Sequence, residues 1–310
     1  MFFFVVLFCY IEDRVMYMNF FDRHKFLTII VIGLCVFSYF YFFKVENKNK
    51  LVDDKSQYYT NDLYMSDQRI YNNYLDEREK KMYNLFLTSL EEGKREVPIK
   101  LLDYSCTDYN DCTTLITKVG EAILVDHPEI MSYSGFGWKF DGKLVLKFDS
   151  AVPVSFFEKI GEQRIKVILS DIIEETKNMS DKEKIRYVYN WMGNNTKYDK
   201  MFTYSSKNQS IYSVFMSKQA VCAGFAKASQ IIFQNIGIKS HCITGNTSDL
   251  HMWNIVEYNG KYYFFDSTVA TSLKKTSDHY YDGLKQEEMS DYIIAHPEWY
   301  PEIEKTSIFP

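Results

Sequence analysis

The chain has 310 residues, 46% of them hydrophobic, which allows one large domain or two modest ones with an appendage. The formal net charge of -5, with no long Lys/Arg run, gives no electrostatic reason to expect a nucleic acid as partner. Because no C-x-x-C pair occurs among the six cysteines, a structural zinc site is not expected either.

The N-terminal part contains an uncharged segment, residues 26–43 (FLTIIVIGLCVFSYFYFF). As a helix it would extend roughly 27 Å, close to the thickness of a bilayer core. A buried core helix would usually show a polar stripe, and a cleaved signal would be followed by small residues, and neither is present here. We therefore predict an uncleaved single-pass transmembrane helix. We expect residues 1–25 in the cytoplasm and a polar stalk at 44–61, although the basic residues nearly balance across the segment.

Residues 62–153 are predicted to form an α+β region. Apolar residues at helical spacing indicate one long helix over residues 66–90 and another over 111–125. Strands are expected at 97–102, 130–140 and 143–148, and the last two flank Asp141-Gly142, a strong hairpin signal. Cys106 and Cys112 either form a small disulfide in an oxidising space or remain two free thiols.

Residues 154–275 are predicted to form a second domain. A helix over 155–177 is followed by Ser180-Asp181-Lys182-Glu183, a capping box that opens a second helix. A third helix begins at Cys222 and is closed by Gly237. Strands follow at 238–244, 251–258 and 261–266. Residues 276–310 form a C-terminal extension, with a short helix expected at 289–295.

Cys222 lies at the first turn of its predicted helix. The unpaired N–H groups and the helix dipole at this position favour a thiolate, and the backbone N–H of Cys222 can face a developing oxyanion. Ala223, Gly224 and Ala226 are small, so a substrate or a strand can approach the helix start closely. Taken alone, a cysteine of this kind is more often a buried structural residue.

The pair Asn259-Gly260 favours a catalytic role for Cys222 over a structural one. It is the preferred sequence for a two-residue type I′ turn. The turn would pair Tyr258 with Lys261. In this register His251 and Asp266 share a sheet face as diagonal neighbours, roughly 7–8 Å apart at Cα. A slip of one residue would place them on opposite faces. An acid that orients a base beside a cysteine is an arrangement for nucleophilic catalysis.

The stretch from about residue 187 to 268 resembles the transglutaminase-like superfamily, and the chain as a whole is similar to a bacterial membrane-anchored member of it. The residues that carry the resemblance are Val221-Cys222-Ala223-Gly224-Phe225-Ala226, Gly237-Ile238, Gly245, His251-Met252-Trp253-Asn254 and Tyr262-Tyr263-Phe264-Phe265-Asp266-Ser267-Thr268. The resemblance implies a papain-like α+β fold, with the nucleophile helix packed on an antiparallel sheet. It implies Cys222 as nucleophile, His251 as base and Asp266 as orienting acid. Phe225 and Met252 depart mildly from the family pattern. Asp126-His127-Pro128-Glu129-Ile130 and the aromatic strand that follows are similar to the leader region of membrane-anchored or secreted bacterial members.

The resemblance implies cysteine-dependent acyl transfer or amide hydrolysis on a protein or peptide substrate, through a thioester. The enzyme would be of transglutaminase, deamidase or peptidase type, with its catalytic domain on the extracellular side. No acidic cluster resembles the calcium sites of animal transglutaminases, so no metal or cofactor is expected. The alternative is a non-catalytic binding or scaffolding module at the cell envelope.

No motif identifies a second oxyanion donor. Tyr198, Tyr212 and Gln219 are the candidates for that role. Trp253 either lines the acyl site or packs within its strand.

Overall fold

The computed structural model describes residues 63–92, 94–131, 133–140, 143–150, 156–200, 208–272 and 291–309, all within one compact unit that begins at Ser56. The predicted transmembrane segment 26–43 and the stalk 44–61 lie outside these residues. Over the ranges that are described, no helix combines the length and the apolar character needed to cross a bilayer.

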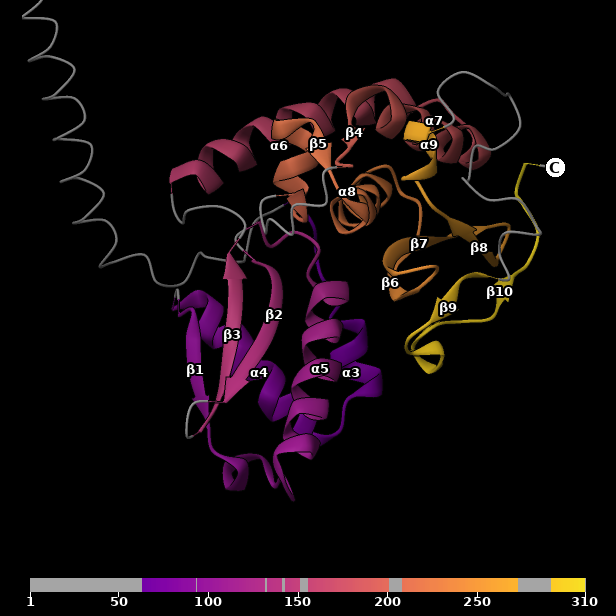
Figure 1. Ribbon diagram of the computed structural model, residues 1–310. Coiled ribbons are helices and arrows are strands. Elements are labelled where there is room, and N and C mark those ends of the chain that lie inside the picture. The colour runs from indigo at the N-terminus through magenta and orange to yellow at the C-terminus, as the bar shows by residue number, and fades with distance from the viewer. Residues whose placement is uncertain are drawn as a thin grey trace, which may run out of the picture. The chain divides into compact units, whose positions relative to one another are not determined.

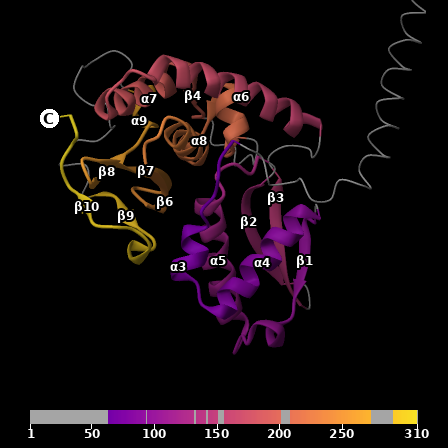
Figure 2. The ribbon, with the colours of Figure 1, turned by 180° about the vertical axis from the view of Figure 1, so that it is seen from behind.

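The first region packs helices against a small sheet. Its elements are α3 (Arg69–Tyr74), α4 (Glu77–Glu91), β1 (Glu96–Ile99), the 3-10 turn η1 (Leu101–Tyr104), α5 (Tyr109–Asp126), β2 (Tyr133–Phe140) and β3 (Leu144–Ser150). In the described ranges these strands have the order β1–β3–β2, with both pairs antiparallel. Helices α3, α4 and α5 lie together beside this sheet (Figure 2). The Phe86 ring of α4 meets Phe136 at 6.0 Å and Phe148 at 5.3 Å, so α4 shares its core with β2 and β3.

The prediction of one long helix over residues 66–90 is wrong, because the chain starts a new helix at Asp76. The Asp76 carboxylate accepts the Glu79 backbone N–H at 2.8 Å, and the Glu79 carboxylate accepts the Asp76 N–H at 2.9 Å. This capping box satisfies the N–H groups of a helix start. The apolar periodicity continues from α3 into α4 and so does not reveal that the helix is interrupted. The spacing of Asp76 and Glu79 was the sequence signal for a new helix start.

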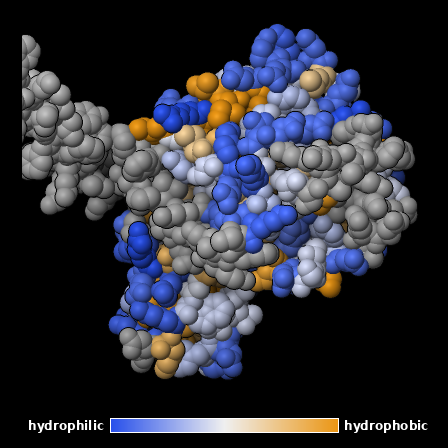
Figure 3. Space-filling view, turned by 45° about the horizontal axis from the view of Figure 1, so that its top comes forward, coloured by the Kyte–Doolittle hydropathy of each residue, from blue (hydrophilic) through white to orange (hydrophobic). Residues whose placement is uncertain are grey.

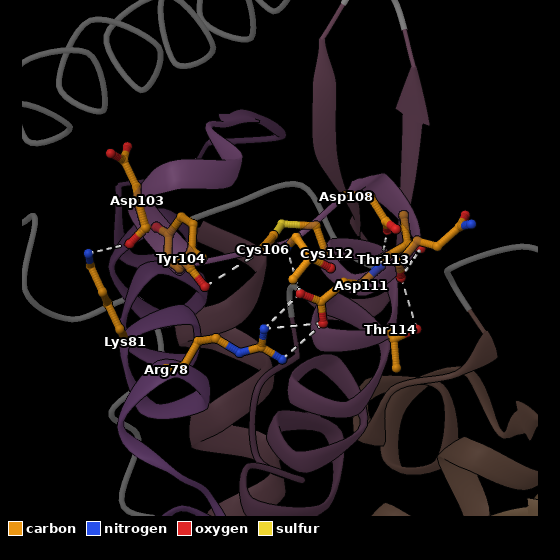
Figure 4. Close-up of a disulfide and its surroundings, with 12 residues drawn as sticks. Arg78, Lys81, Asp103, Tyr104, Cys106, Asp108, Asp111, Cys112, Thr113 and Thr114 are labelled. Atoms are coloured by element: carbon orange, nitrogen blue, oxygen red, sulfur yellow. Dashed lines mark hydrogen bonds and ion pairs between the residues drawn. A yellow bond between two sulfur atoms is a disulfide. The ribbon is translucent and has the colours of Figure 1, made fainter.

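The predicted hairpin strands around Asp141-Gly142 are present as β2 and β3, with Phe140 paired to Leu144, and the two turn residues lie outside the described ranges. Cys106 and Cys112 are joined in a disulfide, with their Cα atoms 5.3 Å apart (Figure 4). Beside it, Arg78 of α4 binds Asp111 through both terminal guanidinium nitrogens at 2.9–3.1 Å. The beginning of α5 is therefore held by a covalent link and by an ion pair.

The second region contains the predicted nucleophile helix and its sheet. Its elements are α6 (Phe156–Thr176), α7 (Asp181–Asn195), β4 (Lys197–Tyr198), the π-helical turn η3 (Ser213–Ser217), β5 (Gln219–Ala220), α8 (Cys222–Asn235), β6 (Ser240–Asn246), β7 (Leu250–Tyr258), β8 (Lys261–Phe265), α9 (Val269–Ser272), β9 (Ile293–Ile294), the 3-10 turn η5 (Pro297–Trp299) and β10 (Ile303–Glu304). Among the described residues, five strands form a sheet in the order β10–β8–β7–β6–β9, and β4 and β5 form a separate parallel pair.

Two predictions made from local sequence motifs in this region are confirmed, the capping box at Ser180 and the turn at Asn259-Gly260. The Ser180 side chain and the Glu183 side chain make both hydrogen bonds of the capping box that opens α7. Asn259 and Gly260 have φ values of 52° and 76°, as a type I′ turn requires, and Tyr258 pairs with Lys261. The helix expected at 289–295 is wrong, because β9 pairs there with Gly245 and Asn246 of β6, while residues 289–290 lie outside the described ranges.

Helix α8 lies between the long helices α6 and α7 and the sheet (Figure 1). The Phe233 ring of α8 packs edge-on against Phe265 of β8 at 4.9 Å, inside a core that also buries Ile185 and Val188 of α7. A second core joins α5 to the other side of the sheet. It contains buried residues of α5, such as Val119 and Ile123, together with Ile243, Trp253 and Ile255 of the sheet. The two regions of the chain therefore share one of their cores.

Helix α6 carries several apolar side chains that are partly open to solvent in the described part of the chain. Ile160, Val167 and Ile173 are exposed. The face of the molecule in Figure 3 is otherwise mainly hydrophilic, with apolar side chains in small groups.

The segment 63–65 runs along the polar side of α8. The Gln234 side chain accepts the Met65 backbone N–H and donates to its carbonyl, both at 2.9 Å. Gln230 donates to the Tyr64 hydroxyl at 2.7 Å, and Asn235 donates to the Leu63 carbonyl at 2.9 Å. Residues far apart in the chain thus hold the C-terminal half of α8.

The motif Asp126-His127-Pro128-Glu129 is buried and joins elements of the fold. The Asp126 carboxylate accepts the N–H groups of Ile70 and Tyr71 at 3.0 and 3.1 Å, so it caps α3. The His127 Nδ1 and Glu129 Oε1 atoms are 2.8 Å apart. Glu129 faces the buried Lys227 of α8, where burial lowers the pKa of the lysine to about 8 although the charges of Cys242 and Glu129 oppose that shift. This motif therefore has a structural role in the chain.

Candidate active site

Cys222 is the first residue of α8, following an extended Val221, and its side chain is partly exposed. The helix start is closely surrounded by the chain that precedes it. A Cβ at Gly224 would lie 2.8 Å from Ser213 Oγ, 2.9 Å from Ala220 Cβ and 3.1 Å from the Asn208 carbonyl oxygen. The small residues at the start of α8 are thus approached closely by other residues of the protein, and these contacts hold the first turn of the helix in place.

Gly224→Ala is expected to lower the free energy of unfolding by about 1–3 kcal/mol, because the added methyl group overpacks this contact. The measurement is urea unfolding monitored by tryptophan fluorescence. Gly137→Ala of β2 is the matched control, since a Cβ there meets nothing within 4 Å. Equal midpoints for the two variants would contradict the close packing at Gly224.

His251 and Asp266 are brought together as the hairpin register predicts. The His251 Nε2 atom donates to Asp266 Oδ2 at 2.7 Å. Asp266 is 1% exposed. Its Oδ1 atom accepts the backbone N–H of Thr268 at 2.9 Å and the Thr268 hydroxyl at 2.6 Å, while its Oδ2 atom also accepts the Tyr292 hydroxyl at 2.8 Å. The carboxylate is therefore held on both oxygens.

The two groups carry opposite charges at neutral pH. Burial lowers the pKa of His251, but hydrogen bonds to Asp266 and Cys222 outweigh it and raise the pKa to about 10. Burial raises the pKa of Asp266, but the hydrogen bonds from His251, Thr268 and Tyr292 bring it below its ordinary value. Because Nε2 is occupied by Asp266, Nδ1 is the ring nitrogen left to face the Cys222 side chain. The structure thus brings the three residues predicted from the sequence together, with His251 hydrogen-bonded to Asp266 and close to Cys222.

Polar contacts between α8 and the sheet fix the distance between the cysteine and its partners. The Asn254 amide of β7 donates to the Ala226 carbonyl at 3.0 Å. The hydroxyls of Ser229 in α8 and Ser267, which follows Asp266, are 2.9 Å apart. The role of Asn254 was missed from the sequence. A buried amide in an apolar strand was the available signal, because such groups are nearly always hydrogen-bonded.

Of the candidates for an oxyanion donor, Tyr198 is the one that the structure brings to Cys222. The parallel pairing of β4 with β5 sets Tyr198 beside Ala220. The Tyr198 hydroxyl lies close enough to the Cys222 backbone N–H and side chain for both to act on its pKa. Burial, followed by the nearby charge of Cys222, raises the pKa of Tyr198 to about 12, so the phenol keeps its proton at neutral pH.

The other candidates lie elsewhere. The Tyr212 ring packs on α6, where a Cβ at Gly161 would lie 3.0 Å from it. Gln219 is on the exposed side of β5. Trp253 is 1% exposed and stacks on His251 with ring centroids 5.7 Å apart, so it supports the imidazole from within the core.

Thr268 and Tyr292 belong to the site as well, although no role for either was predicted from the sequence. Thr268 had a local signal, because a threonine two residues after an aspartate can hydrogen-bond back to its carboxylate. No sequence signal pointed to Tyr292. With 25 tyrosines in the chain, a single one does not stand out, and this residue lay within a predicted helix.

Residues 170–267 match the family model of the transglutaminase-like superfamily, so this part of the chain is a transglutaminase-like domain. No curated protein matches the chain. Among solved structures, a TGase has 17% identity and a TM-score of 0.33, covering 60% of this chain and 53% of its own. A candidate cysteine protease from Cytophaga hutchinsonii has 17% identity and a TM-score of 0.30, covering 43% and 53%. A candidate protease from Parabacteroides distasonis has 13% identity and a TM-score of 0.27, covering 42% and 36%. The chain thus spans about half the length of the first two of these proteins.

Proposed function

We propose that this protein is a cysteine enzyme that transfers or hydrolyses acyl groups of protein or peptide amides through a thioester. Cys222 is the nucleophile, His251 the acid and base, and Asp266 the residue that orients and charges the imidazole. The observation that carries this proposal is the hydrogen bond of 2.7 Å between His251 and Asp266, together with a Cys222 side chain close enough to act on the same imidazole. The thiolate is the reactive form of a cysteine, and an imidazolium at that position is the partner of opposite charge in this scheme.

In the proposed reaction the Cys222 sulfur attacks the carbonyl carbon of an amide, and the carbonyl π electrons move to oxygen. When the tetrahedral intermediate collapses, the C–N bond breaks and the amine leaves with the proton of His251. The thioester is then attacked by water or by a second amine, whose proton passes to the now neutral His251. Breakage of the C–S bond releases the product and restores the thiolate beside the imidazolium.

The oxyanion in this scheme lies between the Cys222 backbone N–H and the Tyr198 hydroxyl. The Tyr198 hydroxyl already lies near the Cys222 backbone N–H. A substrate oxygen that replaces this contact would accept a hydrogen bond from each, because the phenol is protonated at neutral pH and can rotate its hydrogen. Preorganised donors of this kind stabilise the charge that develops in the transition state.

The first test is selective alkylation of the full chain by iodoacetamide at pH 7, with the adducts mapped by mass spectrometry. Cys222 is expected to react and Cys242 to remain unmodified, since Cys242 is fully buried and burial raises the pKa of its thiol to about 12. His251→Ala is expected to abolish the reaction at Cys222. An inert Cys222 in the unaltered protein would sink the enzymatic proposal and favour the binding module.

Reaction type is resolved by a second measurement, in which a glutamine-rich protein is incubated with a labelled primary amine. Incorporation of label indicates acyl transfer to amines, ammonia release without label indicates deamidation, and shortened chains indicate peptidase activity. Cys222→Ala controls for background in each case.

Tyr198→Phe is expected to lower turnover by about 10²-fold or more, the usual effect of losing one oxyanion donor. Its alkylation rate should stay close to that of the unaltered protein, because displacement of iodide forms no oxyanion. Tyr212→Phe, which removes a hydroxyl from the helix-packed candidate, is the matched control. Equal losses of turnover and alkylation in Tyr198→Phe would argue for damage to the thiol itself and against an oxyanion role.

The proposal includes attachment to the membrane through residues 26–43, with the catalytic domain on the extracellular side. The Cys106–Cys112 disulfide supports this side, because disulfides persist in oxidising compartments. Proteolysis of intact cells should remove the domain from the outside. Full protection until the membrane is permeabilised would reverse the orientation.

A further inference from the structure

Tyr292 reaches the site from the C-terminal segment, outside the matched residues 170–267. It directly precedes β9, which pairs with β6 through Ile293 opposite Asn246 and Ile294 opposite Gly245. On its other side, Gly245 pairs with His251 of β7. The strand β6 therefore lies between the two neighbours and brings Tyr292 and His251 to the same end of the sheet.

The Tyr292 side chain contacts Asp266, His251 and Trp253. Its hydroxyl donates to Asp266 Oδ2 at 2.8 Å, the same oxygen that accepts from His251 at 2.7 Å. Its ring lies edge-on to His251, with centroids 5.9 Å apart, and edge-on to Trp253 at 5.0 Å. The ring thus packs against the imidazole whose acid its hydroxyl binds.

This hydroxyl completes a symmetric arrangement on a carboxylate that is shut off from water. Oδ1 is held by the N–H and the hydroxyl of Thr268, and Oδ2 by His251 and Tyr292. A buried carboxylate stays ionised when hydrogen bonds replace its hydration, and two donors on one oxygen limit its rotation. Thr268 adjoins Asp266 in the chain, whereas Tyr292 depends on a separate segment.

That segment is anchored independently of the site. A Cβ at Gly245 would lie 2.1 Å from the Ile293 carbonyl oxygen, so the glycine permits β9 to approach this closely. Further along, His296 Nε2 lies 3.0 Å from a Glu121 carboxylate oxygen of α5. Arg69 of α3 donates to the Trp299 carbonyl. The first region of the fold therefore holds the segment that presents Tyr292.

We propose that Tyr292 is a positioning residue for the reaction, which keeps Asp266 ionised and directed at His251 through its hydroxyl. This inference rests on the proposed function. It makes the C-terminal segment part of the active site, although that segment lies beyond the part of the chain that matches the family.

The test compares Tyr292→Phe with Tyr300→Phe in the full chain. Tyr300 is a buried tyrosine of the same segment whose hydroxyl has no hydrogen-bond partner among the described residues. The readouts are the rate of Cys222 alkylation from pH 3 to 9 and the midpoint of thermal unfolding. Loss of a donor raises the pKa of Asp266, and a protonated Asp266 no longer supports the imidazolium. In Tyr292→Phe the acidic limb of the alkylation profile should move up by about one pH unit, making alkylation about tenfold slower on that limb.

Replacement of Tyr292 by 3-fluorotyrosine provides a second variant that preserves the ring packing. Its more acidic hydroxyl is a stronger donor, so the limb should move to lower pH. Tyr300→Phe should leave the limb where it is in the unaltered protein.

The outcomes separate this inference from the function on which it rests. If Cys222 is reactive and depends on His251, but the limb stays fixed in both Tyr292 variants, Tyr292 has only a packing role and the inference is wrong. A lower unfolding midpoint without a shift in the limb likewise leaves Tyr292 with packing alone. If Cys222 of the unaltered protein is inert, the proposed function fails first.

Discussion

Asp266→Ala is expected to make Cys222 inert toward iodoacetamide at pH 7 and to lower the free energy of unfolding by about 3–5 kcal/mol. The carboxylate is buried and accepts hydrogen bonds from His251, Thr268 and Tyr292. Without it, burial opposes protonation of His251 and the Cys222 sulfur loses its cationic partner. Alkylation kinetics and urea unfolding measure the two effects.

Two further variants separate charge from shape at this position. Asp266→Asn keeps an acceptor oxygen and the side-chain volume, so it should lose most of the reactivity but less of the stability. Asp249→Ala, at an exposed position in the loop before β7, should change neither. Full alkylation of Cys222 in Asp266→Ala would show that the imidazole needs no carboxylate partner.

Raising the pH from 6 to 10 is expected to remove up to about 5 kcal/mol of stability through His251. The pKa of His251 is about 10 in the folded protein, against an ordinary value of 6.5, because the hydrogen bonds to Asp266 and Cys222 outweigh the opposing effect of burial. A base whose pKa is raised on folding contributes its full stability below pH 6.5. That contribution declines as the pH rises through 10.

The measurement is urea unfolding of the unaltered protein and of His251→Gln at a series of pH values. The difference in stability between the two should be largest near pH 6 and should shrink steadily toward pH 10. A difference that stays constant over this range would contradict the assignment of the charge to His251. At acidic pH the stability contribution of Asp266 changes with pH in the opposite direction. Its pKa is lowered in the folded protein, so it adds stability that disappears as the pH falls below 3.8.

The parts of the site that could be predicted from the sequence are those set by neighbouring residues. Asn259 and Gly260 fix the turn, and the turn fixes the register that places His251 and Asp266 together. The start of α8 at Cys222 could also be predicted, because apolar residues at helical spacing follow it directly. Each of these depends on an interaction within one hairpin or one helix, where spacing determines geometry.

The parts that could not be predicted depend on pairing between distant short segments. Tyr198 reaches Cys222 because β4 and β5 pair over two residues each, which is too short for any periodicity to show. Tyr292 reaches Asp266 through β9, another two-residue strand. Spacing could not separate Tyr198 from Tyr212, because no local pattern distinguishes a tyrosine beside the thiol from one that packs on a helix. The transmembrane helix and the side of the membrane stay predictions.

The contacts along α8 bear on how such a domain can be inherited. The matched part begins at residue 170, yet the helix that carries the nucleophile rests on residues 63–65 and faces the buried Glu129 with Lys227. A fragment limited to residues 170–267 would leave this lysine without its acidic neighbour and would open the core shared with α5 to water. The range of residues that matches the family is therefore shorter than the range whose contacts stabilise the fold. We therefore expect a fragment of residues 170–267 to fold less stably than the chain that retains its flanking regions.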